Sequence, residues 1–159
     1  YQSISPKAIY DGSLWPPRRG GTPEVPMDAL VASEPDNVYI LLGANALSGN
    51  TTGDALIEYY SIMLGEIKGR LSTEVKIYIQ ALTPVRPEAK YGMELVHSVN
   101  NRLAKLAMEN GAYFVDLTEP LAGDDGYLRE EYASKLDGIH LTPAGYEAWV
   151  QYLQYLIIY

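Results

Sequence analysis

Near the C-terminal end of the chain, an aspartate stands three residues before one of the two histidines. Asp137 and His140 belong to the string LDGIHLTPAGY, in which the Thr-Pro pair is typical of a helix start. A histidine works as a general base when its imidazole is held in one tautomer, and a carboxylate one turn away can accept the Nδ1 proton. The pair therefore predicts hydrolase chemistry. The alternative is a helix-capping loop with a surface histidine.

An asparagine follows a continuous apolar run in the first third of the chain. Residues 38–42 are all apolar or aromatic, the run stops at Gly43, and Asn45 comes two residues later. An amide at the end of a strand can donate a hydrogen bond to an oxyanion. Gly and Asn also tolerate the positive φ angles of turns, so an ordinary turn is the alternative interpretation.

Taken together and in this order, the two segments resemble the SGNH (GDSL-like) hydrolase superfamily. The third motif of that family is Gly-x-Asn-Asp and its last motif is Asp-x-x-His. Gly43, Asn45, Asp137 and His140 match these positions, whereas Ala46 stands where the family usually has Asp. The resemblance implies a serine-type ester hydrolase in which His140 is the general base, Asp137 orients its imidazole and Asn45 holds the oxyanion.

The resemblance also implies a single three-layer α/β/α domain over residues 1–159, with a parallel sheet of the flavodoxin-like type. The strand and helix patterns of the chain predict the same class, because alternating strands and helices build parallel sheets covered on both faces. The expected elements are a strand at 8–10, a helix at 27–33, a strand at 38–42, a helix at 54–71, a strand at 75–80, a helix at 88–110, a strand at 112–117 and a helix from Thr142 onward.

The nucleophile that the resemblance implies is not evident in this chain. In the family, the serine lies in a Gly-Asp-Ser motif at the end of the first strand, and no such string occurs here. The nearest candidate, Ser13, lies only 30 residues before Gly43, which is too short for the family's intervening helix, strand and glycine motif. We interpret Ser13 as part of a surface turn. The domain is therefore expected to be N-terminally incomplete, with an upstream segment of the same protein completing the sheet.

The sequence also offers a candidate for a second oxyanion donor and a second histidine that could bind a metal. Gly20 and Gly21 fall about where the family's second glycine motif would lie, so a backbone N–H of Gly20 is a candidate donor, although adjacent glycines equally suit a turn. His97 has no metal-type ligand three or four residues further on, which favours a structural role. We predict no metal and no cofactor.

Bulk composition narrows the class of partner. A formal charge of −8 argues against nucleic acid, which requires clustered Lys and Arg. The absence of Cys excludes disulfides and a cysteine nucleophile, and no apolar stretch is long enough to span a membrane. The compartment stays open, and an extracytoplasmic location is compatible with removal of a signal upstream.

The substrate expected from these features is a small-molecule ester. The chain has 14 tyrosines and no long apolar stretch for a lipid, which favours small acyl groups, for example on carbohydrate. One alternative is a catalytically inactive SGNH-like module that binds a glycan or an ester, which Ala46 in place of Asp favours. Another alternative is an unrelated α/β domain.

Overall fold

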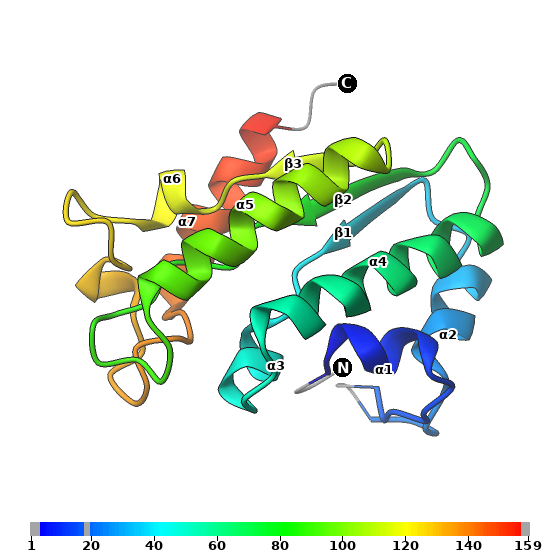
Figure 1. Cartoon of the computed structure of the whole chain (residues 1–159), viewed down its shortest axis with the longest axis horizontal. Helices are drawn as coiled ribbons and strands as arrows, with labels where there is room; N and C mark the ends of the chain where they lie inside the picture. Colours follow the sequence, from blue (N-terminus) through cyan, green and yellow to red (C-terminus); the bar gives the residue numbers. More distant parts are fainter. Residues whose placement is uncertain (1–3, 18–19, 157–159) are drawn as a thin grey trace.

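The computed structural model describes residues 4–17 and 20–156, and a parallel sheet lies at its centre. The three strands, β1 (Asn37–Ile40), β2 (Lys76–Gln80) and β3 (Tyr113–Val115), lie side by side in chain order. The helices are α1 (Pro6–Tyr10), α2 (Pro26–Ala32), α3 (Ala44–Ser48), α4 (Gly53–Arg70), α5 (Met93–Glu109), α6 (Thr118–Leu121) and α7 (Pro143–Leu156), with a 3₁₀ turn at Glu130–Tyr132. In Figure 1, α4 and α5 cover the front of the sheet and α7 lies behind it. The expected three-layer α/β/α class is confirmed.

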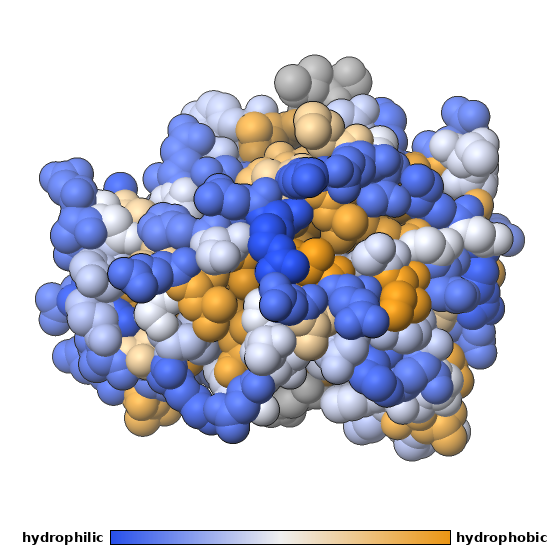
Figure 2. Space-filling view, viewed as in Figure 1, coloured by the Kyte–Doolittle hydropathy of each residue, from blue (hydrophilic) through white to orange (hydrophobic). Residues whose placement is uncertain are grey.

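The main core lies between the sheet and the pair α4 and α5. Val38, Ile40, Ile77 and Ile79 point to this face, because every second residue of a strand faces the same side. The two helices supply apolar residues at helical spacing, including Leu56, Met63, Leu64, Ile67, Val96, Val99 and Leu103. Figure 2 shows the outer side of these helices, where hydrophilic residues cover much of the surface and apolar residues show between them.

The opposite face of the sheet carries a row of tyrosines. Tyr39, Tyr78 and Tyr113 stack across the three strands, with ring centroids 4.5 and 4.9 Å apart. α7 covers this face through Trp149 and Leu153, but only in part. Tyr39 is 41% exposed and Tyr113 is 54% exposed. This side of the sheet is therefore less completely covered than the α4 and α5 side.

The outer edge of β1 has no neighbouring strand among the described residues. Within the described part of the chain β1 pairs with β2 alone, and the Lys76 N–H donates to the Asp36 carbonyl at 3.0 Å. In a parallel ladder of this register, the N–H and C=O groups of Asn37 and Tyr39 point away from β2. The edge can therefore accept a further strand.

The structure corrects two expected elements. Residues 8–10 are not a strand, because Pro6 suits the first turn of a helix and α1 packs against α4, with Ala8 buried. The helix expected from residue 88 begins at Met93 instead. Residues before it form an extended loop, in which the Arg86 N–H donates to the Gly138 carbonyl at 2.9 Å and the Val85 carbonyl accepts from the Leu128 N–H at 3.2 Å. These tertiary contacts hold the loop outside the helix.

Candidate active site

Asp137 and His140 are in direct contact on the loop before α7. Asp137 Oδ2 lies 2.5 Å from His140 Nδ1, and Oδ1 accepts from the backbone N–H groups of Ile139 and His140 at 2.9 and 3.0 Å. Burial alone would raise the pKa of Asp137, but these N–H donors and the imidazole outweigh it and hold the pKa below the ordinary 3.8. Burial and the nearby Asp137 raise the pKa of Tyr91 to about 12, so this phenol stays neutral. Asp137 is thus an anion aimed at Nδ1.

The capping role that could have explained Asp137 belongs to another residue. Thr142 Oγ1 accepts from the Gly145 N–H at 3.3 Å at the start of α7, and the Thr142 hydroxyl donates to the Glu131 carbonyl at 2.8 Å. The start of α7 is therefore capped without the carboxylate, which leaves Asp137 to bind His140.

The loop that carries the pair is fixed by backbone contacts. Gly138 has φ +65°, and a methyl group there would lie 2.8 Å from Arg86 Cβ. The Arg86 N–H donates to the Gly138 carbonyl, and its guanidinium donates to the Leu128 carbonyl at 2.8 Å. The Ser134 N–H donates to the His140 carbonyl at 2.8 Å. Neighbouring loops therefore set the position of the imidazole.

Asn45 lies in the first turn of α3, directly after β1. The turn depends on Gly43, whose φ is +130°, and the Gly43 carbonyl accepts from the Leu47 N–H at 2.9 Å. A methyl group at Gly43 would lie 2.9 Å from Leu82 Cδ2 and 3.1 Å from Leu56 Cδ2. Asn45 is exposed, and within the part of the chain that the structure covers its amide side chain has no hydrogen-bond partner. The amide is available to a ligand.

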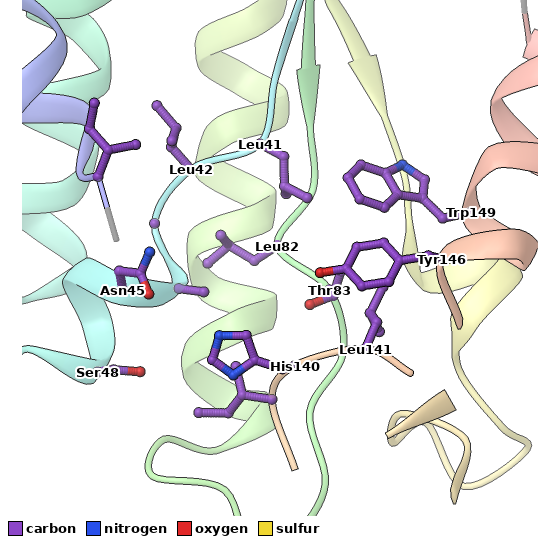
Figure 3. A pocket seen from close by; sticks show the side chains of 14 residues that line it. Leu41, Leu42, Asn45, Ser48, Leu82, Thr83, His140, Leu141, Tyr146 and Trp149 are labelled. Carbon is purple, nitrogen blue, oxygen red and sulfur yellow. The ribbon is translucent and has the colours of Figure 1, made fainter. Parts of the chain in front are cut away.

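Both motifs border one pocket at the carboxyl edge of the strands. Its volume is about 230 Å³, and its polar and aromatic lining consists of Asn45, Ser48, Thr83, His140, Tyr146 and Trp149. Figure 3 shows His140 between α3, with Asn45 and Ser48, and α7, with Tyr146 and Trp149. Trp149 is oriented by its Nε1–H, which donates to Gln80 Oε1 at 2.8 Å. Ligands of open α/β sheets bind at this edge.

Gly20 and Ser13 do not line this pocket. The Gly20 N–H donates to the Pro17 carbonyl at 3.0 Å, so it is used within a turn. Ser13 lies in a turn closed by its N–H and the Asp11 carboxylate at 3.0 Å. Among residues 4–17 and 20–156, the His140 ring is hydrogen bonded only to Asp137. The structure thus brings three of the candidate residues together and leaves these two apart.

Four pocket residues were missed from the sequence. Ser48 follows Asn45 by three residues and shares its helix face, and Tyr146 and Trp149 have the same spacing on α7, so helical periodicity was the available signal. Thr83 carried no such signal. His97 is exposed on α5 and does not line the pocket.

The described ranges contain neither a metal-binding cluster of side chains nor a membrane-spanning helix. No group of three or more His, Asp or Glu side chains in residues 4–17 and 20–156 could hold a metal ion. No helix in these same ranges is both long and apolar enough to cross a membrane.

The sequence matches the GDSL-like Lipase/Acylhydrolase family over residues 15–148. The chain belongs to this family. No curated protein matches it. Among solved structures, a G-D-S-L family protein from Desulfitobacterium hafniense has a TM-score of 0.73 at 14% identity, with 98% of this chain and 77% of that chain covered.

Two other solved structures with a similar fold come from Bacteroides thetaiotaomicron and Geobacillus. A GDSL-like lipase from the former has a TM-score of 0.65 at 23% identity, covering 82% of this chain and 65% of that chain. An acetyl-xylooligosaccharide esterase from the latter has a TM-score of 0.67 at 16% identity, covering 84% and 64%. The chain spans 60 to 65% of the length of several such relatives. At these identities the likeness establishes the fold.

Proposed function

We propose that this chain carries the general base, the orienting carboxylate and an oxyanion donor of a serine-type ester hydrolase. The observation that carries the proposal is the 2.5 Å contact of Asp137 with His140 Nδ1. Asn45, whose amide has no partner among residues 4–17 and 20–156, lines the same pocket as His140. Membership of the acylhydrolase family supports the same class of reaction.

The geometry fits acyl transfer to water. A serine hydroxyl attacks the ester carbonyl and gives its proton to His140 Nε2, while the carbonyl oxygen becomes an oxyanion that accepts from the Asn45 amide. The carbon–oxygen bond to the alcohol then breaks, and His140 protonates the leaving oxygen. Water repeats the sequence on the acyl-enzyme. Asp137 stabilises the imidazolium that forms in each half-reaction.

The serine is proposed to come from an upstream segment of the same protein that pairs with β1. The outer N–H and C=O groups of Asn37 and Tyr39 are unpaired with any described strand, and Tyr39 is half exposed beside them. A strand added there would end beside Gly43 and Asn45, because the carboxyl ends of parallel strands meet at one edge. Residues 1–159 would then form one domain with that segment.

A small acyl ester on carbohydrate is the proposed substrate. The pocket of about 230 Å³ is small, and Tyr146 and Trp149, with ring centroids 5.9 Å apart, place amphipathic rings beside His140. Two relatives of the same fold are an acetyl-xylooligosaccharide esterase and an acetyl xylan esterase, which supports testing acetylated oligosaccharides first.

Labelling with a fluorophosphonate probe followed by peptide mapping tests the proposal. The 159-residue chain would be compared with the product of the complete reading frame that contains it, each with and without His140→Ala. We expect labelling of a serine outside this chain in the longer product, and its loss in the His140→Ala variant but not in the His97→Ala control.

Three other results would each contradict part of the proposal. Labelling of Ser13 or Ser48 in the 159-residue chain would refute an external nucleophile while keeping the hydrolase. Labelling that survives His140→Ala would remove His140 from the mechanism. No labelling in either product, together with binding of an acetylated oligosaccharide, would favour the binding module that Ala46 suggested.

A further inference from the structure

Two buried side chains hold the backbone at the points where β1 and β2 stop pairing. The Tyr60 hydroxyl of α4 donates to the Leu42 carbonyl at 2.7 Å and accepts from the Leu42 N–H at 3.1 Å. The Asn100 amide of α5 donates to the Leu82 carbonyl at 3.0 Å and accepts from the Leu82 N–H at 2.8 Å. Each side chain thus satisfies both backbone groups of one residue.

The two contacts are related by position in the chain. Leu42 and Leu82 each lie two residues beyond the end of their strand. Each partner follows 18 residues later on the next long helix, α4 for Tyr60 and α5 for Asn100. Tyr60 is 0% exposed and Asn100 is 7% exposed. The same device therefore occurs in two successive strand–helix units.

The residues held in this way lead directly into the candidate site. Gly43 follows Leu42 and turns the chain into α3, so that Asn45 comes three residues after the Tyr60 contact. Thr83 follows Leu82 and lines the same pocket. The two held segments also pack together, since a methyl group at Gly43 would meet Leu82 Cδ2 at 2.9 Å.

The chemistry of the two side chains suits the task. Hydroxyl and amide groups can each donate and accept, so one side chain replaces the two hydrogen bonds that a neighbouring strand would have given. Burial raises the pKa of Tyr60, so its hydroxyl keeps the proton that it donates to Leu42. Buried backbone groups left without partners are costly, which makes the alternative positions of these turns unfavourable.

We propose that Tyr60 and Asn100 are positioning residues of the ester-hydrolase site, which fix the turns that present Asn45 and Thr83 to the substrate. The inference rests on the proposed function for its catalytic consequence. Its geometric part, the placement of Asn45 by Tyr60, can be measured on the 159-residue chain itself.

The test compares Tyr60→Phe with Ile67→Val, a conservative control on the same helix. Ile67 is 1% exposed, packs in the same core and does not line the pocket. In ¹H–¹⁵N spectra of the 159-residue chain, we expect Tyr60→Phe to shift the side-chain amide signals of Asn45, and Ile67→Val to leave them unchanged. In the longer protein made from the complete reading frame, Tyr60→Phe should lower the kcat of ester hydrolysis by about 10- to 100-fold with little change in KM. Small misplacements of a catalytic group have effects of this size.

The possible results separate the inference from the proposed function. Asn45 signals and kcat of Tyr60→Phe that match those of the control would overturn the inference. If the longer protein without substitutions has no esterase activity, the proposed function fails. The Asn45 signals of the 159-residue chain then decide alone whether Tyr60 positions that side chain. Asn100→Leu provides the second variant, with an expected shift of the Thr83 backbone signals, and unchanged Thr83 signals would remove Asn100 from the proposal.

Discussion

Replacing Gly43 with alanine is expected to destabilise the chain strongly. Gly43 has φ +130°, where an L-residue is strained by about 1 to 3 kcal/mol. The new methyl group would also lie 2.9 Å from Leu82 Cδ2 and 3.1 Å from Leu56 Cδ2. Leu56 is 0% exposed and Leu82 is 1% exposed, so neither has open space to move into, and such overpacking costs about 1 to 3 kcal/mol. The expected loss is therefore about 2 to 6 kcal/mol, a large share of the roughly 5 to 15 kcal/mol of an ordinary domain.

Urea unfolding followed by circular dichroism measures this loss, and Gly65→Ala is the matched control. Gly65 lies inside α4, and apart from its chain neighbours and the backbone of its own helix no described atom lies within 4 Å of the position of an added methyl group. The same substitution there should stabilise the chain by about 0.5 to 1 kcal/mol, because alanine is the better helix former. If Gly43→Ala unfolds within about 0.5 kcal/mol of the unmodified chain, a range ordinary for surface substitutions, the argument that this turn requires glycine is wrong.

Three further predictions concern the candidate site. In the longer protein made from the complete reading frame, His140→Ala should lower kcat on a p-nitrophenyl ester by about 10⁴-fold or more. His97→Ala should leave kcat near the value of the unsubstituted protein. Retention of most activity by His140→Ala would contradict the hydrolase mechanism. Asn45→Ala should lower kcat by about 10² to 10³ with little change in KM, and equal effects on both constants would instead indicate a role in substrate binding. The pKa of Asp137 is lower in the folded chain than its ordinary value of 3.8, so near that pH the folded chain binds fewer protons than the unfolded chain. The ionised Asp137 therefore stabilises the fold above pH 3.8, and this stabilisation is lost as the pH falls through the folded pKa. Urea unfolding from pH 3 to 7 should therefore show the difference between the unmodified chain and Asp137→Asn shrinking at the acid end; a difference that is constant with pH would contradict this assignment.

Much of the fold follows from local sequence patterns. The 3.6-residue spacing of apolar residues predicted α4, and the continuous apolar run before Gly43 predicted β1. The motif residues Asp137 and His140 could be assigned to the loop before the last helix. Asn45 could be assigned to the segment after β1, but the short helix α3 that contains it was not predicted. Family membership was visible in the same motifs, because a few residue types at fixed order and spacing suffice to identify it.

The short and irregular segments were not decided by sequence. Three apolar residues at 8–10 suit a strand or one turn of helix equally well, and contact with α4 selected the helix. The helix pattern of α5 extends back to Glu88, but the hydrogen bond from the Arg86 N–H to the Gly138 carbonyl holds that stretch outside the helix. Local preference is weak over a few residues, so tertiary contacts determined the outcome.

The sequence by itself determined which side chains could do chemistry and on which segments they lie. It determined the family, the order of the main strands and helices, and the pairing of Asp137 with His140, since these depend on residue types and short spacings. Only the tertiary structure decided that Asn45, Ser48, Thr83 and Trp149 border the same pocket as His140, and that Gly20 does not. Distances between segments far apart in the chain are set by packing and by long-range contacts such as that of Tyr60 with Leu42. Such contacts leave no periodic trace in the sequence, which is why the arrangement of the site emerged only from the folded chain.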